Sequence, residues 1–281
     1  MALRASSGED REFSFSDMEF RFLADTARAQ TGIVLAEHKK DMVYSRIVRR
    51  LRALKLKSFS QYCTLLEGPD GETEMVHLIN ALTTNLTSFF REQHHFEHLR
   101  DHVLAPLATQ PSARRIRLWS AACSAGMEPY SMAMVMRHAL PDIDRRDARI
   151  LATDIDTAML ATASHGTYPM AQYDNIPAEY RRHVQVDTTQ DRMEMAETLK
   201  NMIAFKPLNL LESWPMEGQF DAVFCRNVVI YFDKPTQAEL FNRMAEHIVP
   251  GGWLYIGHSE NLFNVCDRFE LLGRTIYRRV R

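Results

Sequence analysis

RIRLWSAACSAGMEPYSMAMVMRHAL, residues 115–140, is the stretch that decides the fold. The mostly apolar residues 116–119 predict a buried strand, and the loop 121–126 that follows consists almost entirely of small residues. Pro129 is tolerated in the first turn of a helix, and residues 130–140 are predicted to be helical. A strand, a small-residue loop and a helix in this order form the opening unit of a nucleotide-binding α/β fold.

The small-residue loop also restricts the ligand. A dinucleotide loop uses G-x-G-x-x-G and a P-loop uses G-x-x-x-x-G-K-[ST], whereas this loop contains only Gly126 and no lysine follows it. The loop therefore favours a nucleoside without phosphates, commonly S-adenosylmethionine, and a dinucleotide stays the alternative. A second predicted strand, residues 149–153, ends in Asp154, at the position where a carboxylate binds ribose hydroxyls in such folds.

Length and composition set broad limits on the protein. At roughly 150 residues per domain, 281 residues predict two domains, or a large and a small one. The apolar fraction of 46% and the net charge of −2 indicate a globular protein with no overall preference for nucleic acid or membrane. The polar start, the absence of a long apolar run and four widely spaced cysteines predict a cytoplasmic protein with reduced thiols.

The order of predicted elements gives the domain organisation. We expect a flexible tail over residues 1–13, an all-α N-terminal domain over 14–110 and an α/β domain over 111–281. Residues 167–200 resist a single periodicity and are predicted to form a small β sub-domain inserted into the α/β domain. Five strands that alternate with helices, followed by a C-terminal hairpin, are typical of the Rossmann-like sheet of adenosylmethionine-dependent methyltransferases.

The segment 38–57 carries eight basic residues against one acid, Asp41. On a helix its apolar residues form one stripe, and Arg46, Arg49 and Arg50 lie side by side along the flank of that stripe. Such a charge run is often only a solvated helix face, and the alternative is a docking surface for an acidic partner. DNA is disfavoured because neither a helix-turn-helix pattern nor interleaved aromatic residues are present.

Three histidines recur at a spacing of four residues, at positions 94, 98 and 102. They would share one face of a helix, beside the apolar stripe of Phe96, Leu99 and Val103. Because no acidic or cysteine ligand completes a recognisable site, we expect solvated histidines and no metal.

Several motifs together resemble the CheR family, the chemotaxis receptor glutamate methyltransferases. MVYSRIVRRLRAL at 42–54 resembles that family's N-terminal helix, and the similarity runs in the same order from about residue 20 to the C-terminus. The other motifs are NLTSFFRE (85–92), SAACSAGMEPYS (120–131), TDID (153–156), FCRNVVIYFD (224–233) and GHSEN (257–261). Such a set is highly specific.

The resemblance implies methyl transfer from S-adenosylmethionine to the glutamate side chains of receptor signalling helices. The implied cofactor-binding residues are Asn85, Thr87, Arg91, Glu128, Asp154, Asn209, Leu210, Arg226 and Asn227. The family commonly has two acids where this chain has Met127 and Glu128. Arg91 is also a candidate for holding the substrate carboxylate, and the sequence does not choose between the two roles.

The chemistry requires little beyond alignment. A glutamate with a pKa of about 4.3 is already ionised at pH 7, so no general base is needed, and proximity alone is worth up to ~7–11 kcal/mol. Tyr231 is a candidate to position the carboxylate, which makes Tyr231 and Arg91 the predicted catalytic residues. Arg46, Arg49 and Arg50 become a predicted docking surface for glutamate-rich receptor helices.

The resemblance leaves two questions open. Some family members also bind a tether at the receptor's C-terminus, but residues 187–199 contain no glycine and predict a short loop, which favours a tether-independent enzyme. A carboxyl methyltransferase for another protein and a non-catalytic nucleoside-binding regulator stay as alternative functions.

Overall fold

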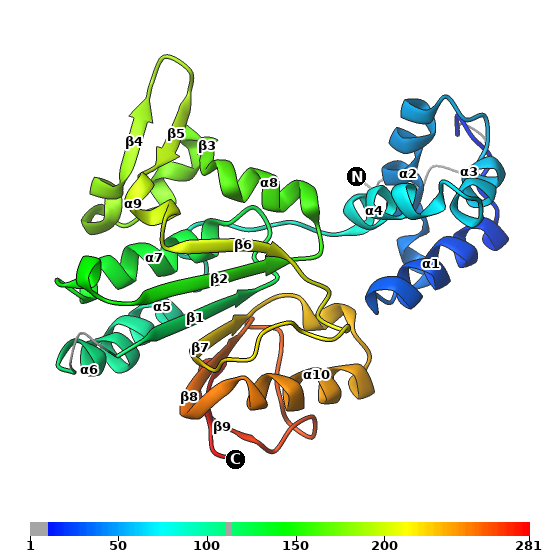
Figure 1. Ribbon diagram of the computed structural model, residues 1–281. Helices are drawn as coiled ribbons and strands as arrows, with labels where there is room; N and C mark the ends of the chain where they lie inside the picture. The colour runs from blue at the N-terminus through cyan, green and yellow to red at the C-terminus, as the bar shows by residue number, and fades with distance from the viewer. Residues whose placement is uncertain (1–10, 111–113) are drawn as a thin grey trace, which may run out of the picture. The chain divides into compact units, whose positions relative to one another are not determined.

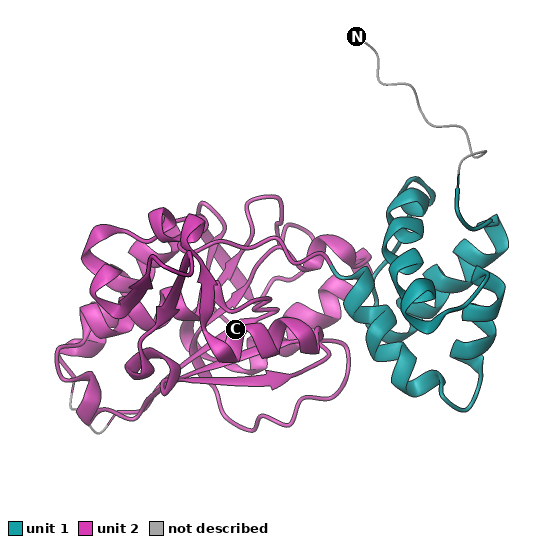
Figure 2. Ribbon diagram, turned by 90° about the horizontal axis from the view of Figure 1, so that it is seen from above, with its two compact units in different colours: residues 1–83 teal, residues 84–281 magenta. Residues whose placement is uncertain are grey.

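The computed structural model describes residues 11–110 and 114–281 and divides the chain into two compact units, residues 1–83 and 84–281 (Figure 2). Most of the predicted N-terminal tail and the first residues after the predicted boundary at 110 lie outside the described residues.

The first unit is helical, as the sequence predicts. Its helices are α1 (Asp17–Thr31), η1 (Glu37–Lys39), α2 (Lys40–Leu54), α3 (Phe59–Glu67) and α4 (Gly71–Leu82). A capping box of Ser16 and Glu19 begins α1, and Gly32 ends it at φ 72°. The buried face of α2, with Val43, Ile47 and Leu51 fully inaccessible, packs into one core with α1, α3 and α4.

The second unit is built on a seven-stranded sheet in the order β6-β2-β1-β7-β8-β10-β9 (Figure 1). The first five strands in this order are parallel, and β10 and β9 close the sheet as an antiparallel hairpin. The strands are β1 (Ile116–Ala121), β2 (Ala148–Asp154), β6 (Ile203–Pro207), β7 (Phe220–Cys225), β8 (Ile248–Ile256), β9 (Phe269–Gly273) and β10 (Ile276–Arg279). The fold predicted from the sequence, a Rossmann-like methyltransferase sheet with a C-terminal hairpin, is confirmed.

Helices connect and cover these strands. They are α5 (His94–His98), the π-helical segment η2 (Leu99–Leu104), α6 (Ala105–Ala108), α7 (Met127–Ala139), η3 (Ile143–Arg145), α8 (Thr157–His165), α9 (Glu197–Lys200), η6 (Val229–Tyr231) and α10 (Lys234–Glu246). Helix α7 begins three residues before the predicted start, because Gly126 occupies the N-cap position at φ 87°.

The boundary between the units differs from the predicted one. Residues 94–108 belong to the second unit, although they are helical, because their apolar side chains pack into the core of the sheet. Phe96, Leu99 and Leu107 share that core with Leu118 of β1 and Tyr255 of β8. Helical periodicity predicts the helices but does not reveal which core they join.

The inserted segment forms a separate small sheet with the order β3-β5-β4. Its strands are β3 (Thr167–Pro169), β4 (Val184–Asp187) and β5 (Arg192–Met195), with the short helices η4 (Met170–Asn175) and η5 (Ala178–His183) between the first two. Tyr168, Met193 and Met195 bury their side chains in the same core as α7. The small sheet therefore packs on the α/β unit rather than standing apart from it.

Candidate functional site

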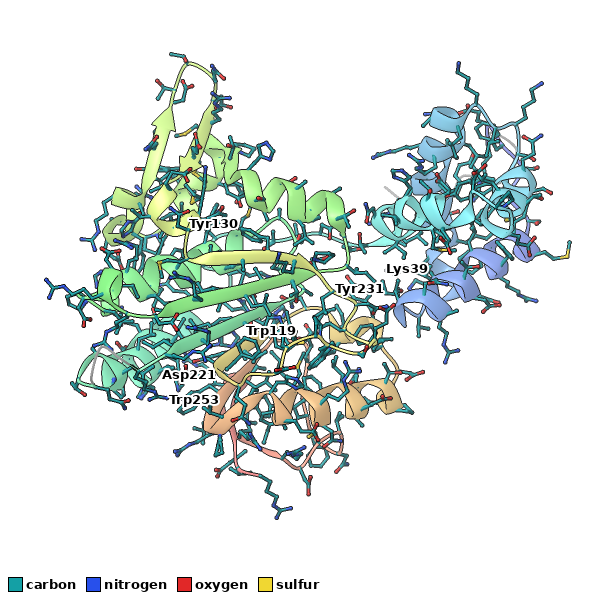
Figure 3. The ribbon with its side chains drawn as sticks, viewed as in Figure 1. Lys39, Trp119, Tyr130, Asp221, Tyr231 and Trp253 are labelled. Carbon is teal, nitrogen blue, oxygen red and sulfur yellow. The ribbon has the colours of Figure 1, made fainter. Side chains whose placement is uncertain are left out.

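The candidate site lies where the parallel strands end. The chain adds β2 and β6 on one side of β1 and then crosses to add β7 on the other side, so the order of the strands reverses between β1 and β7. Such a reversal, at the carboxyl ends of the strands, is the usual ligand position in open α/β sheets. Asp221, at the start of β7, and Tyr231, beyond its end, lie at opposite ends of the sheet (Figure 3).

The small-residue loop after β1 folds closely over the end of β2. Ala122, Ser124 and Gly126 all have positive φ angles, of 65°, 49° and 87°. A Cβ on Gly126 would lie 2.6 Å from the Cβ of Ala163, so only glycine fits there. The backbone N–H of Ser124 donates to Asp154 Oδ2 at 2.7 Å. The loop thus brings backbone close to the carboxylate predicted to bind ribose.

Asp154 is buried at the end of β2. Its Oδ1 accepts a second backbone hydrogen bond, from Asp156 at 2.8 Å, and burial raises the pKa of Asp154 to about 6 against the effect of these hydrogen bonds. Each carboxylate oxygen retains a further acceptor site for a ligand hydroxyl. Asn85 donates to Oδ2 of the neighbouring Asp156 at 2.8 Å. This hydrogen bond holds the 85–92 segment against the end of β2.

Arg226 links three elements in the interior of the site. Its guanidinium, 3% exposed, pairs with Glu128 Oε2 at 3.0 Å and with Glu92 Oε2 at 3.5 Å, and it donates to the backbone carbonyl of Arg91. Glu128 also accepts from Ser120 Oγ at 2.7 Å. Met127, in contrast, is buried in the apolar core, so Glu128 is the residue of this pair that reaches the site.

The group has more acids than bases. Burial raises the pKa of Glu128 although Arg226 opposes this shift, whereas for Glu92 the effect of burial is outweighed by Arg226 and by hydrogen bonds from His258, and its pKa is lowered. With both acids ionised, the two carboxylates and the one guanidinium carry a net charge of −1. A buried charge excess of this sign favours a cationic ligand.

Glu260 anchors the two neighbouring loops. Its buried carboxylate accepts backbone N–H groups from Gly257 at 2.6 Å, Asn227 at 2.9 Å, Val229 at 3.0 Å and Ile230 at 3.3 Å. A Cβ on Gly257 would collide with the Asn227 side chain. Asn227, at φ 57°, is thereby held in a left-handed conformation directly after Arg226.

The predicted catalytic residues lie beside these anchors. Tyr231 ends the helical turn η6 and is half-buried, and its hydroxyl makes no hydrogen bond to any residue that the structure describes. Arg91 is also half-buried and donates through Nη1 to the Leu86 carbonyl at 2.8 Å. The structure thus places both residues near the strand ends without assigning either to the cofactor or to the substrate.

The remaining predicted cofactor-binding residues follow the same edge. Asn209 and Leu210 follow β6, where the N–H of Leu208 donates to the Asp154 carbonyl at 3.0 Å. Leu210 is buried, and Asn209 bonds to Leu211 and Glu212 within its own turn. Thr87 is half-buried in the segment that Asn85 ties down. All of these residues belong to the second unit.

The three arginines of the predicted docking surface have different surroundings. Arg50 forms a bidentate ion pair with buried Glu74, with nitrogen–oxygen distances of 2.9 and 2.6 Å. Arg46 donates to the carbonyls of residues 81–83 at the end of α4. Arg49 is exposed. Two of the three guanidinium groups therefore stabilise the helical unit itself.

Of the three predicted histidines, His102 is exposed, whereas His94 and His98 are half-buried. His98 is half-buried, with Nδ1 2.9 Å from the Tyr255 hydroxyl and its ring against Trp253. His95 is fully buried beside Glu92, and burial lowers its pKa to about 3. Sequence reasoning did not assign Glu92 a role, although it directly follows Arg91 in the 85–92 motif. Its contacts to Arg226 and His258 span 134 and 166 residues, beyond any local signal.

Comparison with known proteins places these residues in context. Residues 85–278 match the family model described as CheR methyltransferase, SAM binding domain, and residues 18–83 match the CheR methyltransferase, all-alpha domain. The chain is 43% identical over 256 residues to a probable chemotaxis protein methyltransferase of Rhizobium etli, with 89% of this chain and 95% of the relative covered. It is 41% identical over 272 residues to chemotaxis protein methyltransferase 2 of Pseudomonas aeruginosa, with 95% of each covered.

The similarity to solved structures is at a lower level. The DhpI–SAH complex shares 15% identity with this chain, with a TM-score of 0.36 and 68% of each chain covered. In the described parts of the chain, no helix has the length and apolar character needed to cross a bilayer.

Proposed function

The chain belongs to the CheR family of chemotaxis protein methyltransferases, and from this premise we propose which of its residues hold the methyl donor and the receptor glutamate. It is an S-adenosylmethionine-dependent protein-glutamate O-methyltransferase that acts on chemoreceptors. The observation that carries the residue assignment is the group of acidic side chains at the strand ends, where Asp154 accepts from the Ser124 N–H of the small-residue loop and Glu128 pairs with Arg226.

The residues fit a nucleoside that carries a positive charge. Asp154 presents acceptor sites suited to ribose hydroxyls. The net charge of −1 on Glu92, Glu128 and Arg226 suits the cationic end of S-adenosylmethionine. Asn85, Thr87, Asn209, Leu210 and Asn227 complete the proposed cofactor-binding set around this edge of the sheet.

When bound, S-adenosylmethionine supplies a methyl group already activated by a sulfonium. The glutamate needs no base because its side chain is ionised at neutral pH. The task of the protein is to bring the carboxylate in line with the methyl group and to keep water out. We assign the alignment to Tyr231, whose hydroxyl is available to donate to one carboxylate oxygen, and to Arg91, which supports either that carboxylate or the cofactor's own.

The helical unit is the proposed docking surface for the receptor helix. Among the three predicted arginines, exposed Arg49 is best placed to meet a glutamate-rich helix directly. Arg50 is engaged by Glu74, and Arg46 holds the end of α4, so their contribution is through the local positive field. Weakening by salt is the expected signature of such a contact.

We further propose that the enzyme is cytoplasmic and methylates receptors without a C-terminal tether. The loop between β4 and β5 comprises only residues 188–191. Asp187 caps this turn by accepting from the N–H groups of Thr189 and Gln190, and Asp191 completes it at φ 50°. Receptors with and without their C-terminal tail are then expected to be methylated at the same rate. A clear preference for the tailed receptor would contradict this proposal.

The site assignment is tested with radiolabelled S-adenosylmethionine and receptor-containing membranes. The label should enter the receptor and be released by base as methanol, which identifies a carboxyl ester. Asp154→Asn should bind S-adenosylhomocysteine about 10–100-fold more weakly, because a charge-assisted hydrogen bond is worth about 1.5–3 kcal/mol. Unchanged binding by this variant would remove Asp154 from the cofactor site.

Asp221→Asn is the matched control. Asp221 is also a buried strand carboxylate whose pKa burial raises, but it lies at the start of β7 and pairs with Arg114 at 2.8 Å (Figure 3). Its substitution should leave the affinity for S-adenosylhomocysteine unchanged. Equal losses in both variants would indicate a general effect on the sheet instead.

A further inference from the structure

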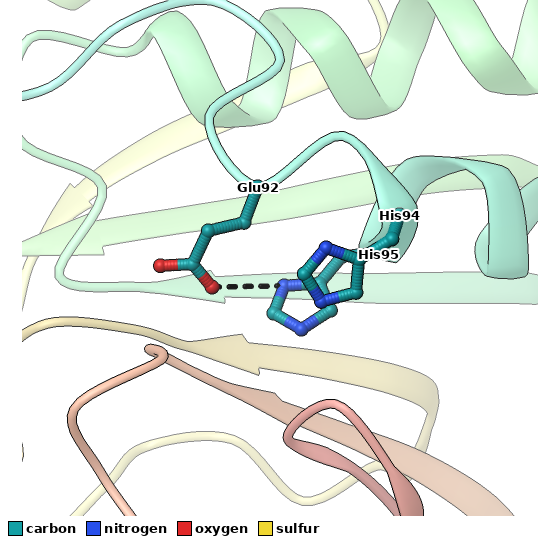
Figure 4. A group of neighbouring side chains, drawn as sticks. All are labelled: Glu92, His94 and His95. Atoms are coloured by element: carbon teal, nitrogen blue, oxygen red, sulfur yellow. Dashed lines mark ion pairs between the residues drawn. The ribbon is translucent and has the colours of Figure 1, made fainter.

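Glu92, His94 and His95 form a compact group of potential metal ligands, here called the Glu–His–His cluster (Figure 4). One ring nitrogen of each histidine and one carboxylate oxygen lie within 4.8 Å of one another. The sequence prediction considered histidines 94, 98 and 102 on one helix face, whereas the structure brings together a neighbouring pair of histidines and an acid.

The hydrogen bonds of His95 determine which of its nitrogens carries the hydrogen. Nε2 lies 3.1 Å from the backbone oxygen of Arg274 and 3.1 Å from Thr275 Oγ1. Thr275 donates its own hydroxyl hydrogen to the same Arg274 oxygen, at 2.6 Å, so both neighbours of Nε2 act as acceptors. Nε2 must therefore be the donor, and Nδ1 of the neutral ring carries a free lone pair.

That lone pair faces another acceptor. His95 Nδ1 lies 3.5 Å from Glu92 Oε2, and among the described residues neither atom has a hydrogen-bond partner. Both atoms are inaccessible to solvent, and the His95 side chain is 0% exposed. Two buried acceptors that face each other repel unless a positively charged or hydrogen-donating species lies between them.

His94 adds a second ring, whose centroid lies 4.2 Å from that of His95 and whose plane is tilted by 56° to it. Its Nε2 lies 3.0 Å from the same Arg274 carbonyl oxygen, so its neutral form also donates there and leaves Nδ1 bare. Histidines that bind metals usually donate their second ring N–H to a carboxylate or a backbone carbonyl, which fixes the ring for coordination. Here the Arg274 carbonyl does this for His94, and His95 Nε2 is shared between that carbonyl and Thr275 Oγ1.

We propose that the Glu–His–His cluster binds one divalent transition-metal ion of the zinc type, and that the bound ion inhibits methyl transfer. Two imidazole nitrogens and one carboxylate suit such an ion, and three protein ligands leave a fourth position for water. The ligands would be one Glu92 carboxylate oxygen and one ring nitrogen from each histidine, the atoms that lie within 4.8 Å of one another.

The inhibition follows from the second role of Glu92. The same Oε2 is 3.5 Å from the Arg226 guanidinium, and Oε1 is 3.0 Å from His258 Nδ1. An ion that draws the carboxylate toward the histidines separates it from Arg226, whose positive charge in turn weakens the metal site. The ion and an ordered Arg226 therefore compete for Glu92. This inhibitory part rests on the proposed function, whereas the binding part does not.

Binding is tested on the full chain with Zn²⁺ alone, by competition with a chromophoric chelator. We expect one ion per chain, and at least tenfold weaker binding by His94→Ala, since even the loss of a ligand's supporting partner weakens metal binding 10–100-fold. His102→Ala is the matched control, because His102 is exposed and stacks on His98 outside the cluster. It should bind Zn²⁺ as the unchanged protein does.

The nature of the ligands is tested with Co²⁺. Tetrahedral nitrogen and oxygen ligation should give a visible absorption band that His94→Ala and His94→Gln both lose. An intense near-ultraviolet thiolate band would place the ion on a cysteine and overturn the proposal. So would equal Zn²⁺ affinity in the unchanged protein and both His94 variants, or no bound ion, which would leave a water between Glu92 and His95.

Inhibition is measured after metal-free methyl transfer and S-adenosylhomocysteine binding have been established, so that failure of the proposed function is recognised separately. Added Zn²⁺ should slow the unchanged enzyme and His102→Ala but not His94→Ala, whose metal-free rate should stay within about twofold of the unchanged rate. If Zn²⁺ slows all three proteins alike, the inhibitory part is overturned.

Discussion

Arginines hold together both the helical unit and the strand-end site, but the two regions balance their charges differently. In the helical unit Arg50 meets one acid, Glu74, which also accepts from the Tyr62 hydroxyl at 2.8 Å. At the strand ends Arg226 meets two acids, so these three side chains carry a net charge of −1 when both acids are ionised. A buried ion pair with equal and opposite charges needs only a structural role. A buried group with an excess of negative charge indicates that a positively charged ligand binds there.

Removal of each arginine tests this contrast most directly. Arg226→Ala removes the guanidinium that pairs with both Glu92 and Glu128 and should lower the free energy of unfolding by about 3–5 kcal/mol. Arg50→Ala should lower it by less because the Arg50–Glu74 pair is partly solvated. Only Arg226→Ala should also weaken S-adenosylhomocysteine binding. All three tryptophans belong to the second unit, so their fluorescence in urea reports its unfolding separately from the helical circular dichroism of both units. Weakened S-adenosylhomocysteine binding by Arg50→Ala would contradict this difference between the two regions.

A substitution at Tyr231 tests whether a residue at the strand-end site contributes to catalysis rather than to stability. Tyr231→Phe removes only a hydroxyl that lacks a partner among the described residues, so the stability should hardly change. If the hydroxyl positions the glutamate, kcat should fall about 10–100-fold, corresponding to the loss of a hydrogen bond to a charged group, while binding of S-adenosylhomocysteine is retained. Steady-state kinetics and calorimetry separate the two. An unchanged kcat would make Tyr231 a packing residue.

The pKa of Asp154 gives the strand-end site a pH dependence that the helical unit should lack. Burial raises this pKa to about 6, so the free protein is penalised for ionising Asp154 as the pH rises from about 4 to 6. Cofactor binding requires the ionised form. Affinity should therefore be constant above pH 6 and fall by up to about tenfold per unit below it. Asp154→Asn should bind weakly and nearly independently of pH between 5 and 7. A decline of the same size in this variant would assign the titration elsewhere.

The smallest effect is expected at Arg49, on the surface of the helical unit. Arg49→Glu should raise the KM for receptor several-fold without altering kcat, and added salt should reduce the difference between variant and unchanged enzyme. Arg145→Glu is a control of equal charge change, on the exposed turn η3 before β2, at the far end of the sheet from the site. Equal effects of both variants would indicate net charge rather than docking.

Much of the fold could be predicted because short sequence patterns mark where the strands lie and where they end. The apolar run that becomes β1 and the acid that ends β2 are short-range signals, and the structure pairs these two strands in parallel. Composition alone did not reveal that helices α5 to α6 pack on the sheet, since Phe96 and Leu107 would suit either core.

The site could be predicted only in part, for a related reason. Glu128 and Asp154 lie in recognisable motifs, but the partners of Arg226 come from residues 92 and 128, which no periodicity connects to it. For the basic residues of α2, the position on the helix could be predicted but the partners could not. Their spacing correctly placed the arginines on the flank of the helix but did not show that Glu74 and the end of α4 engage two of them.

Glu260 has a consequence for how this protein can change. The Glu260 carboxylate accepts hydrogen bonds from backbone N–H groups of two separate crossovers. Residues 226–231 and 257–260 are therefore expected to behave as one structural unit. An insertion in either crossover would therefore loosen the other. For anyone recombining such proteins, the two crossovers should be exchanged together.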